Sequence, residues 1–146
     1  MDRRARGPYL GFKPGKFQLS NAPIVSIVDD DESVRTAMTD MVESLGYTVA
    51  AFASGAEFLG SDRLHDSACL ITDVRMPSMS GFELHDRLIA AGHLGATIFL
   101  TAFPDEKDND RAKKAGAVAY LAKPCRRDDL VAVIHSILAR GAGRQS

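Results

Sequence analysis

The stretch IVSIVDD at residues 24–30 is a largely apolar run that stops at two carboxylates. Three later stretches follow the same plan: LITD at 70–73 ends in an acid, IFLT at 98–101 in a hydroxyl, and YLAKP at 120–124 in a lysine and a proline. Short apolar runs bounded by loop residues are typical of buried parallel strands. Because ligands of an open parallel sheet bind outside the carboxyl ends of its strands, four strands would deliver these polar groups to one edge. Such a set of groups suits a phosphoryl group together with a divalent cation.

From residue 24 onward, strand and helix patterns alternate. The predicted strands are 24–28, 48–52, 69–72, 97–100 and 118–122, and the predicted helices are 32–45, a short one capped by Ser54, one after Gly81, 105–115 and 128–139. This alternation predicts an α/β fold, a doubly wound parallel sheet of five strands with five helices. In a flavodoxin-like strand order of 2-1-3-4-5, the first and third strands would be neighbours, so that Asp29, Asp30 and Asp73 would converge.

Composition and length indicate an ordinary globular domain. The 146 residues are 45% apolar and 25% charged, and no run approaches the ~18 apolar residues of a membrane span. No apolar segment follows the charged start, which argues against a signal peptide. The two cysteines, Cys69 and Cys125, provide neither a disulfide framework nor metal-ligand spacing, so we expect a reducing, cytoplasmic location.

The charge is unevenly distributed along the chain. Residues 1–22 hold five basic residues and one acidic residue, a net charge of +4, whereas the remaining 13 basic and 18 acidic residues give −5. An acidic body argues against a DNA-binding surface on the domain itself. The basic segment could contact nucleic acid or anionic lipid, but its glycines and prolines favour a flexible tail. We therefore expect a tail over 1–22, one domain over 23–140, and a short tail over 141–146.

The acidic run at 29–32 has two interpretations. Acids at a helix N-terminus complement the helix dipole, which is sufficient to explain Asp31 and Glu32. Asp29 and Asp30 directly follow a buried strand, which favours a cation site for these two. Magnesium prefers hard oxygen ligands and needs only one or two carboxylates.

Asp73 and Lys123 indicate a phosphoryl site only when they are considered together. An aspartate at a strand end is usually a turn residue, but beside a cation site and a lysine it becomes a candidate nucleophile that forms an acyl phosphate. Clustered carboxylates raise each other's pKa values, and a dication with Lys123 would offset that effect. Thr101 could donate to a phosphoryl oxygen, or could simply be a β-branched strand end. The peptide bond between Lys123 and Pro124 can be cis in a tight turn.

Four segments in order carry a family resemblance: VDDDESVR (28–35), LITDVRMPSMSGFEL (70–84), FLTAF (99–103) and AGAVAYLAKP (115–124). Together they resemble the receiver domain of bacterial two-component response regulators. Their sequences are most similar to those of FixJ-type receivers. The resemblance covers about residues 23–140. It implies Asp73 as the phosphoacceptor, and Mg²⁺ held by Asp30, Asp73 and the backbone carbonyl of Arg75, with Asp29 acting mainly through water.

The resemblance also implies roles for residues around the acids. Lys123 and Thr101 would contact the phosphoryl oxygens, and Tyr120 matches an aromatic switch position whose ring turns inward when Thr101 moves. Phe103 occupies a position that tunes phosphate lifetime and could shield the site from water. Cys125 stands where receivers often have phenylalanine, so that core packing and redox sensing are its two candidate roles.

The function implied is phosphorelay signal transduction. A sensor histidine kinase or phosphotransfer protein would supply the phosphoryl group, and the receiver would switch conformation. Such a receiver phosphorylates and dephosphorylates itself and is not a turnover enzyme. Helix 105–115, strand 118–122 and helix 128–139 could form a homodimer surface, although a charged helix such as 105–115 can also simply be solvated.

Several interpretations of the whole protein stay open. With no output domain visible after residue 140, the pattern indicates a single-domain adaptor, shuttle or phosphate sink. The alternative is the receiver half of a FixJ/LuxR-type transcription factor whose DNA-binding domain is missing. A phosphatase of the haloacid dehalogenase type would need a second aspartate two residues after the nucleophile, where this chain has Arg75. A degenerate receiver is disfavoured by the intact set of Asp30, Asp73, Thr101 and Lys123.

Overall fold

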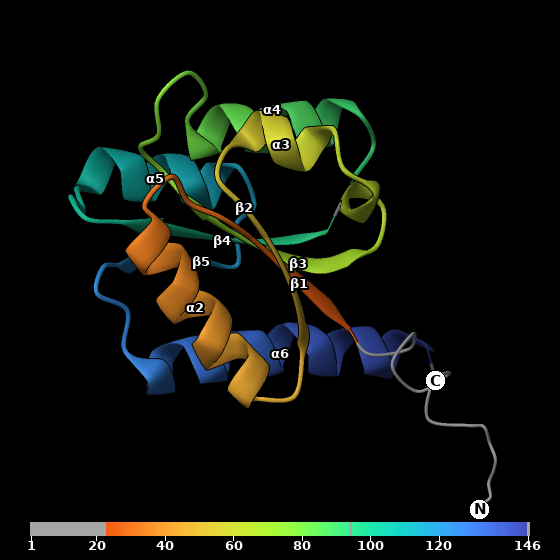
Figure 1. Ribbon diagram of the computed structural model, residues 1–146. Helices are drawn as coiled ribbons and strands as arrows, with labels where there is room; N and C mark the ends of the chain where they lie inside the picture. The colour runs from red at the N-terminus through yellow and green to blue at the C-terminus, as the bar shows by residue number, and fades with distance from the viewer. Residues whose placement is uncertain (1–22, 94, 146) are drawn as a thin grey trace, which may run out of the picture.

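A computed structural model describes residues 23–93 and 95–145, with side chains described through residue 139. Its core is one five-stranded parallel sheet with helices on both faces (Figure 1). The strands are β1 (Ile24–Val28), β2 (Thr48–Phe52), β3 (Ser67–Asp73), β4 (Ala96–Thr101) and β5 (Ala119–Ala122). Their order, β2-β1-β3-β4-β5, confirms the predicted flavodoxin-like topology. The expected basic tail over 1–22 lies outside the described residues.

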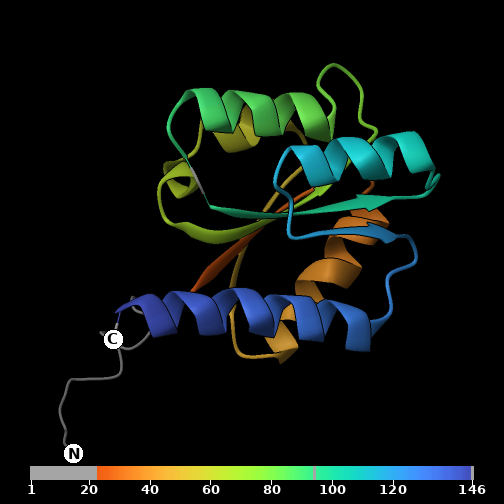
Figure 2. The same cartoon turned by 180° about the vertical axis from the view of Figure 1, so that it is seen from behind.

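Two helices cover one face of the sheet and three cover the other. Figures 1 and 2 show α2 (Glu32–Ser44) and α6 (Arg127–Gln145) together on one side. On the other side lie α3 (Gly55–Leu59), α4 (Gly81–Ala90) and α5 (Glu106–Lys114). A short 3₁₀ helix, η1 (Asp62–Leu64), precedes β3 and was not predicted.

Local polar residues set where the helices begin. The side chains of Asp31, Ser54, Ser80 and Asp105 each accept a hydrogen bond from the backbone N–H three residues later. Such caps satisfy backbone donors that have no partner within the helix. The helix start predicted at Ser54 is therefore confirmed, and Asp31 lies at a helix N-terminus as expected, where it also caps α2.

Helix α6 is longer than the sequence predicted. We expected it to end at Ala139 and to be followed by a short tail over 141–146, but the backbone stays helical through Gln145. The added part of the helix contains Gly141 and Gly143, and a glycine weakens a helix interior by only about 1 kcal/mol. No proline interrupts this segment, so the helix can continue.

The core has one layer on each face of the sheet. Between the sheet and the α2–α6 pair, the largest buried cluster includes Ile27, Ile71, Ile98, Leu130 and Ile134. Two smaller clusters lie under α3, α4 and α5. Helix α5 contributes a single buried side chain, that of Ala112, as its almost uniformly charged sequence predicted.

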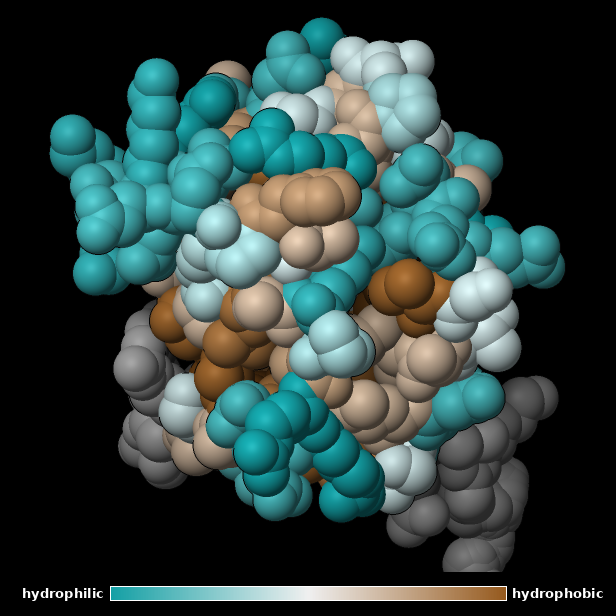
Figure 3. Space-filling model, turned by 90° about the vertical axis from the view of Figure 1, so that its left-hand side faces the viewer, coloured by the Kyte–Doolittle hydropathy of each residue, from teal (hydrophilic) through white to brown (hydrophobic). Residues whose placement is uncertain are grey.

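Strand register brings the chemistry-bearing residues to one edge. Val28 pairs with Thr72 across β1 and β3, Asp73 with Leu100 across β3 and β4, and Thr101 with Ala122 across β4 and β5. The carboxyl ends of four strands are therefore level with one another. Figure 3 views the molecule from this edge, where exposed apolar side chains are interspersed with hydrophilic ones.

Candidate functional site

Three carboxylates converge where β1 and β3 end. Asp29 directly follows β1, Asp73 is the last residue of β3, and these two strands are neighbours. One carboxylate oxygen from each of Asp29, Asp30 and Asp73 lies within 4.8 Å of the other two. Asp29 and Asp73 are buried, at 2% and 7% exposure, whereas Asp30 is exposed. Hard carboxylate oxygens at such spacing fit a divalent cation such as Mg²⁺, so the trio can bind a metal ion.

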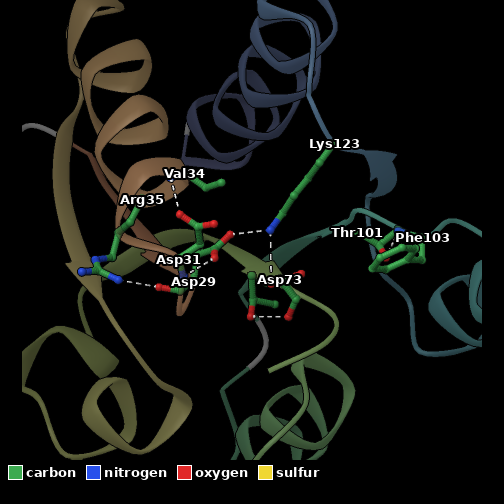
Figure 4. Close-up of polar contacts among 9 residues, drawn as sticks. Asp29, Asp31, Val34, Arg35, Asp73, Thr101, Phe103 and Lys123 are labelled. Carbon is green, nitrogen blue, oxygen red and sulfur yellow. Dashed lines mark hydrogen bonds and ion pairs between the residues drawn. The ribbon is translucent and has the colours of Figure 1, made fainter. Parts of the chain in front are cut away.

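Lys123 lies between the two buried acids (Figure 4). Its Nζ is 2.7 Å from Oδ2 of Asp29 and 3.2 Å from Oδ2 of Asp73. Its backbone N–H donates to the carbonyl of Thr101, which extends the β4–β5 pairing by one residue. The following peptide bond to Pro124 is cis, as the sequence allowed. The fold therefore brings the acids and the lysine together, as predicted.

The pKa values of this group reflect burial and opposite charge. Burial raises the pKa of Asp73, Lys123 lowers it and Asp29 raises it, and the net result is a raised pKa. For Lys123, burial lowers the pKa, but the interactions with Asp29 and Asp73 outweigh burial, so the pKa is raised and the ammonium stays charged. Two acids sharing one ammonium leave an excess of negative charge, which a dication would offset.

The backbone around Asp29 is held by further polar contacts. Its Oδ1 accepts a hydrogen bond of 2.9 Å from the backbone N–H of Asp31. Its carbonyl accepts one of 2.8 Å from the guanidinium of Arg35, on the first turn of α2 (Figure 4). The first contact orients the Asp29 carboxylate, and the second holds the Asp29 backbone. No pattern in the sequence pointed to Arg35, because the contact depends on the turn between β1 and α2.

Thr101 and Tyr120 have other partners than the acids. Thr101 is fully buried, and its Oγ1 accepts from the backbone N–H of Phe103 at 3.1 Å. Figure 4 shows Thr101 and Phe103 apart from Lys123 and Asp73, and within the described residues no hydrogen bond joins Thr101 to the acids. The hydroxyl of Tyr120 accepts from the backbone N–H of Asp105, the N-cap of α5. Phe103 itself is 70% exposed.

Arg75 reaches toward α5, a contact the sequence did not predict. Its Nη2 lies 2.7 Å from Oδ2 of Asp108 and 3.7 Å from Oδ2 of Asp105. The loop that follows Asp73 is therefore tied to the first turn of α5, next to the N-cap residue Asp105 that contacts Tyr120. Arg75 and Asp108 are 33 positions apart in sequence, so that only the fold reveals the contact.

A glycine brings the start of α4 against the phosphoacceptor candidate. The N–H of Gly81 donates to the carbonyl of Val74 at 2.8 Å. A Cβ at Gly81 would lie closer than 3.0 Å to the carbonyl oxygen of Asp73, a distance that real Cβ atoms essentially never show. Only glycine therefore allows this approach between α4 and the end of β3.

Cys125 packs against the core and lines a shallow apolar groove beside Lys123. The groove also includes Met38, Met41 and Pro124. Burial raises the pKa of the Cys125 thiol, and Asp129 raises it further. Because the thiolate is the reactive form, these shifts favour the core-packing role over redox sensing.

The fold and the site together define an α/β domain whose carboxylate trio and facing lysine would suit a divalent cation and a phosphoryl group. Residues 25–135 match the family model of the response regulator receiver domain. The chain therefore belongs to the response regulator receiver family, whose domains act in phosphorelay signalling. Within residues 23–93 and 95–145, no helix is both long and apolar enough to cross a membrane.

Relatives agree with this assignment. The chain is 38% identical over 123 residues to the transcriptional regulatory protein FixJ of Azorhizobium caulinodans, covering 83% of this chain and 58% of that protein. It is 37% identical over 119 residues to the transcriptional regulatory protein TdiR of Thauera aromatica, covering 82% and 52%. The aligned region thus spans little more than half the length of these curated relatives.

Solved structures agree as well. The response regulator StyR superposes with a TM-score of 0.77 at 38% identity, covering 85% of this chain and 63% of that one. The FixJ-N structure gives a TM-score of 0.71 at 33% identity, covering 79% and 92%.

Proposed function

We propose that residues 23–140 form a receiver domain that accepts a phosphoryl group on Asp73 from the phosphohistidine of a sensor kinase or a phosphotransfer protein. The observation that carries this proposal is the position of Lys123 Nζ, within 3.2 Å of a carboxylate oxygen of both Asp29 and Asp73. A carboxylate oxygen of Asp73 attacks phosphorus, an O–P bond forms, and the P–N bond to the donor imidazole breaks. The donor imidazole leaves with the electron pair of that bond.

The remaining residues supply positioning and charge. Asp30, Asp73 and the backbone carbonyl of Arg75 would hold Mg²⁺, with Asp29 contributing through water. Bound Mg²⁺ would neutralise charge on the phosphoryl oxygens. Lys123 would exchange its contact with the Asp73 carboxylate for one with a phosphoryl oxygen. In this way the protein lowers the barrier mainly by orientation and electrostatics.

The switch would start at Thr101. To donate to a phosphoryl oxygen, its hydroxyl would have to move from its present position beside the N–H of Phe103. That movement shifts the loop between β4 and α5, where Tyr120 contacts Asp105, and the Tyr120 ring would turn inward. A phosphoryl group can shift the population only because it contacts the two conformations differently.

The output is proposed to be a protein contact and not catalytic turnover. The surface of α5, β5 and α6 borders Thr101 and Tyr120 and would form the contact, including a homodimer. The domain would work in the cytoplasm, without membrane insertion and without binding nucleic acid itself. A single-domain adaptor or shuttle is the first form of this proposal, and the receiver half of a FixJ/LuxR-type transcription factor is the second. Reading the gene beyond codon 146 separates the two forms.

Intact-protein mass spectrometry after incubation with acetyl phosphate tests the proposal. One added phosphoryl group is expected in the wild type with Mg²⁺, and none without it. Asp73→Asn and Asp30→Asn should lose the added mass. Asp31→Asn is the matched control, because Asp31 belongs to the same acidic run but only caps α2. An adduct that persists in Asp73→Asn, or a wild type that gains no mass with Mg²⁺, would overturn the proposal.

A further inference from the structure

A second cavity lies at the opposite edge of the sheet, where β3 and β4 begin. Its volume is about 210 Å³, and its lining includes Ser67 and Thr97 at the starts of these strands. Three of the chain's four histidines also line it: His65, His85 and His93. His65 follows η1 and His93 follows α4, and Figures 1 and 2 both show these two connections side by side. The proposed phosphoryl site does not use this cavity.

The rings of His65 and His93 lie close together, at a separation that suits a shared ligand. Their centroids are 4.8 Å apart, with an angle of 52° between the ring planes. Two imidazoles that each bind one metal ion through a nitrogen at ~2.0–2.1 Å place their ring centroids roughly 5 Å apart. The observed separation of the two rings is therefore compatible with one metal ion bound between them.

Neither imidazole is engaged elsewhere in the described part of the chain. Within residues 23–93 and 95–139, no hydrogen bond or ion pair involves the side chain of His65 or His93. The neighbouring Asp66 pairs instead with Arg63, at 3.5 Å. The ring nitrogens of both histidines are thus available to a ligand in the cavity.

A third histidine, His85, gives an independent argument for a ligand in the cavity. Its side chain is buried, at 5% residue exposure, and packs edge-on against Phe99 with ring centroids 5.7 Å apart. In the described ranges its imidazole has no hydrogen-bond partner, although buried polar groups nearly always have one. Burial lowers the pKa of His85, which favours the neutral imidazole. A ligand or water in the cavity would supply the missing partner.

We propose that His65 and His93 chelate a divalent transition-metal ion of the Zn²⁺ type, with water in the remaining positions. Neutral imidazole suits Zn²⁺, Cu²⁺ and Ni²⁺, whereas Mg²⁺ prefers oxygen ligands. The two cation sites therefore differ in ligand chemistry and lie at opposite edges of the sheet. Bound metal would join the η1–β3 connection to the α4–β4 connection and stabilise the folded domain by mass action.

Calorimetric titration of the untagged protein with ZnCl₂, in excess MgCl₂, tests the site. The wild type should bind one Zn²⁺ ion that Mg²⁺ does not displace. His65→Gln and His93→Gln should each weaken binding by roughly a hundredfold, because losing one arm of a chelate removes its intramolecular advantage. His135→Gln is the matched control, since His135 is exposed and lies against Tyr47 on the α2–α6 side.

Imidazole ¹⁵N spectra give a readout that a folding defect would not imitate. On addition of Zn²⁺, the signals of His65 and His93 should shift while those of His135 stay in place. The thermal unfolding of each variant without metal should match that of the wild type. Absence of Zn²⁺ binding in the wild type, or unchanged binding in both glutamine variants, would overturn the proposal. Loss of binding in Cys125→Ser would assign the ion to the thiol and would also overturn it.

Discussion

Lys123 and Asp29, 94 positions apart in sequence, form an ion pair of 2.7 Å with side-chain exposures of only 14% and 3%. Asp73 shares the same ammonium at 3.2 Å. One lysine therefore compensates the charge of two buried carboxylates.

Lys123→Ala should destabilise the metal-free domain by about 3–5 kcal/mol at neutral pH, because it leaves two buried acids without a cation. Urea unfolding in the presence of a chelator measures this loss, and added Mg²⁺ should recover part of it. Lys107→Ala, on the exposed side of α5, should change the free energy of unfolding by less than about 0.5 kcal/mol. A loss for Lys123→Ala as small as that of Lys107→Ala would contradict the prediction.

Asp73→Asn should stabilise the metal-free protein, and the gain should depend on pH. The pKa of Asp73 is raised above its ordinary value of 3.8, so ionisation is less favourable in the folded state than in the unfolded state. The wild type therefore loses stability as the pH rises from 3.8 through the raised pKa, and the asparagine variant does not. The difference in unfolding free energy between the two proteins, measured along this pH range with a chelator, should grow with pH. A variant that is less stable than the wild type throughout would refute this interpretation of the site.

Gly81→Ala should destabilise the domain by roughly 2–3 kcal/mol, since the new Cβ collides with the backbone carbonyl of Asp73. The same variant should lose phosphoryl uptake, because the end of β3 has to shift. Gly60→Ala is the matched control. Its Cβ would meet nothing closer than 3.5 Å, so a change within about 0.5 kcal/mol is expected. Equal effects of the two substitutions, measured by chemical denaturation, would show that the close approach is not the cause.

Arg75→Ala should keep Mg²⁺ binding, because only the backbone carbonyl of this residue is a proposed ligand. A double-mutant cycle with Asp108→Ala should give a coupling energy of about 0.2–1 kcal/mol, as is usual for a partly exposed ion pair. Magnesium titration and urea unfolding of the two single variants and the double variant give both quantities. A substantial loss of Mg²⁺ affinity in Arg75→Ala would mean that the side chain participates in the site.

The sheet and the acidic site could be predicted because their signals are local. Each strand was visible as an apolar run, and the rule that parallel strands present ligands at their carboxyl ends placed Asp29, Asp73 and Lys123 together. Capping residues such as Ser54 also predicted helix starts, because a cap depends only on residues nearby in the sequence. The periodicity of apolar residues along the chain does not determine the strand order. Right-handed crossovers permit only a few topologies, and the observed order is the predicted one.

Long-range side-chain contacts could not be predicted. The ion pair of Arg75 with Asp108 and the hydrogen bond of Tyr120 to Asp105 depend on how α5 sits over the sheet. Thr101 was correctly placed at a strand end, but its present partner, the N–H of Phe103, follows from the turn after β4. The predicted end of α6 was wrong because the apolar pattern stops near Leu138 while the backbone stays helical through Gln145.

Helix α5 holds only Ala112 inside the core, and its other eight residues are at or near the surface. Folding therefore places few demands on its sequence, although its first turn is tied to the loop after the phosphoacceptor candidate. In evolutionary terms, substitutions can accumulate along this helix without unfolding the domain or altering the carboxylate trio. A lineage could thus acquire a new partner through α5 while its phosphoryl chemistry stays as it was.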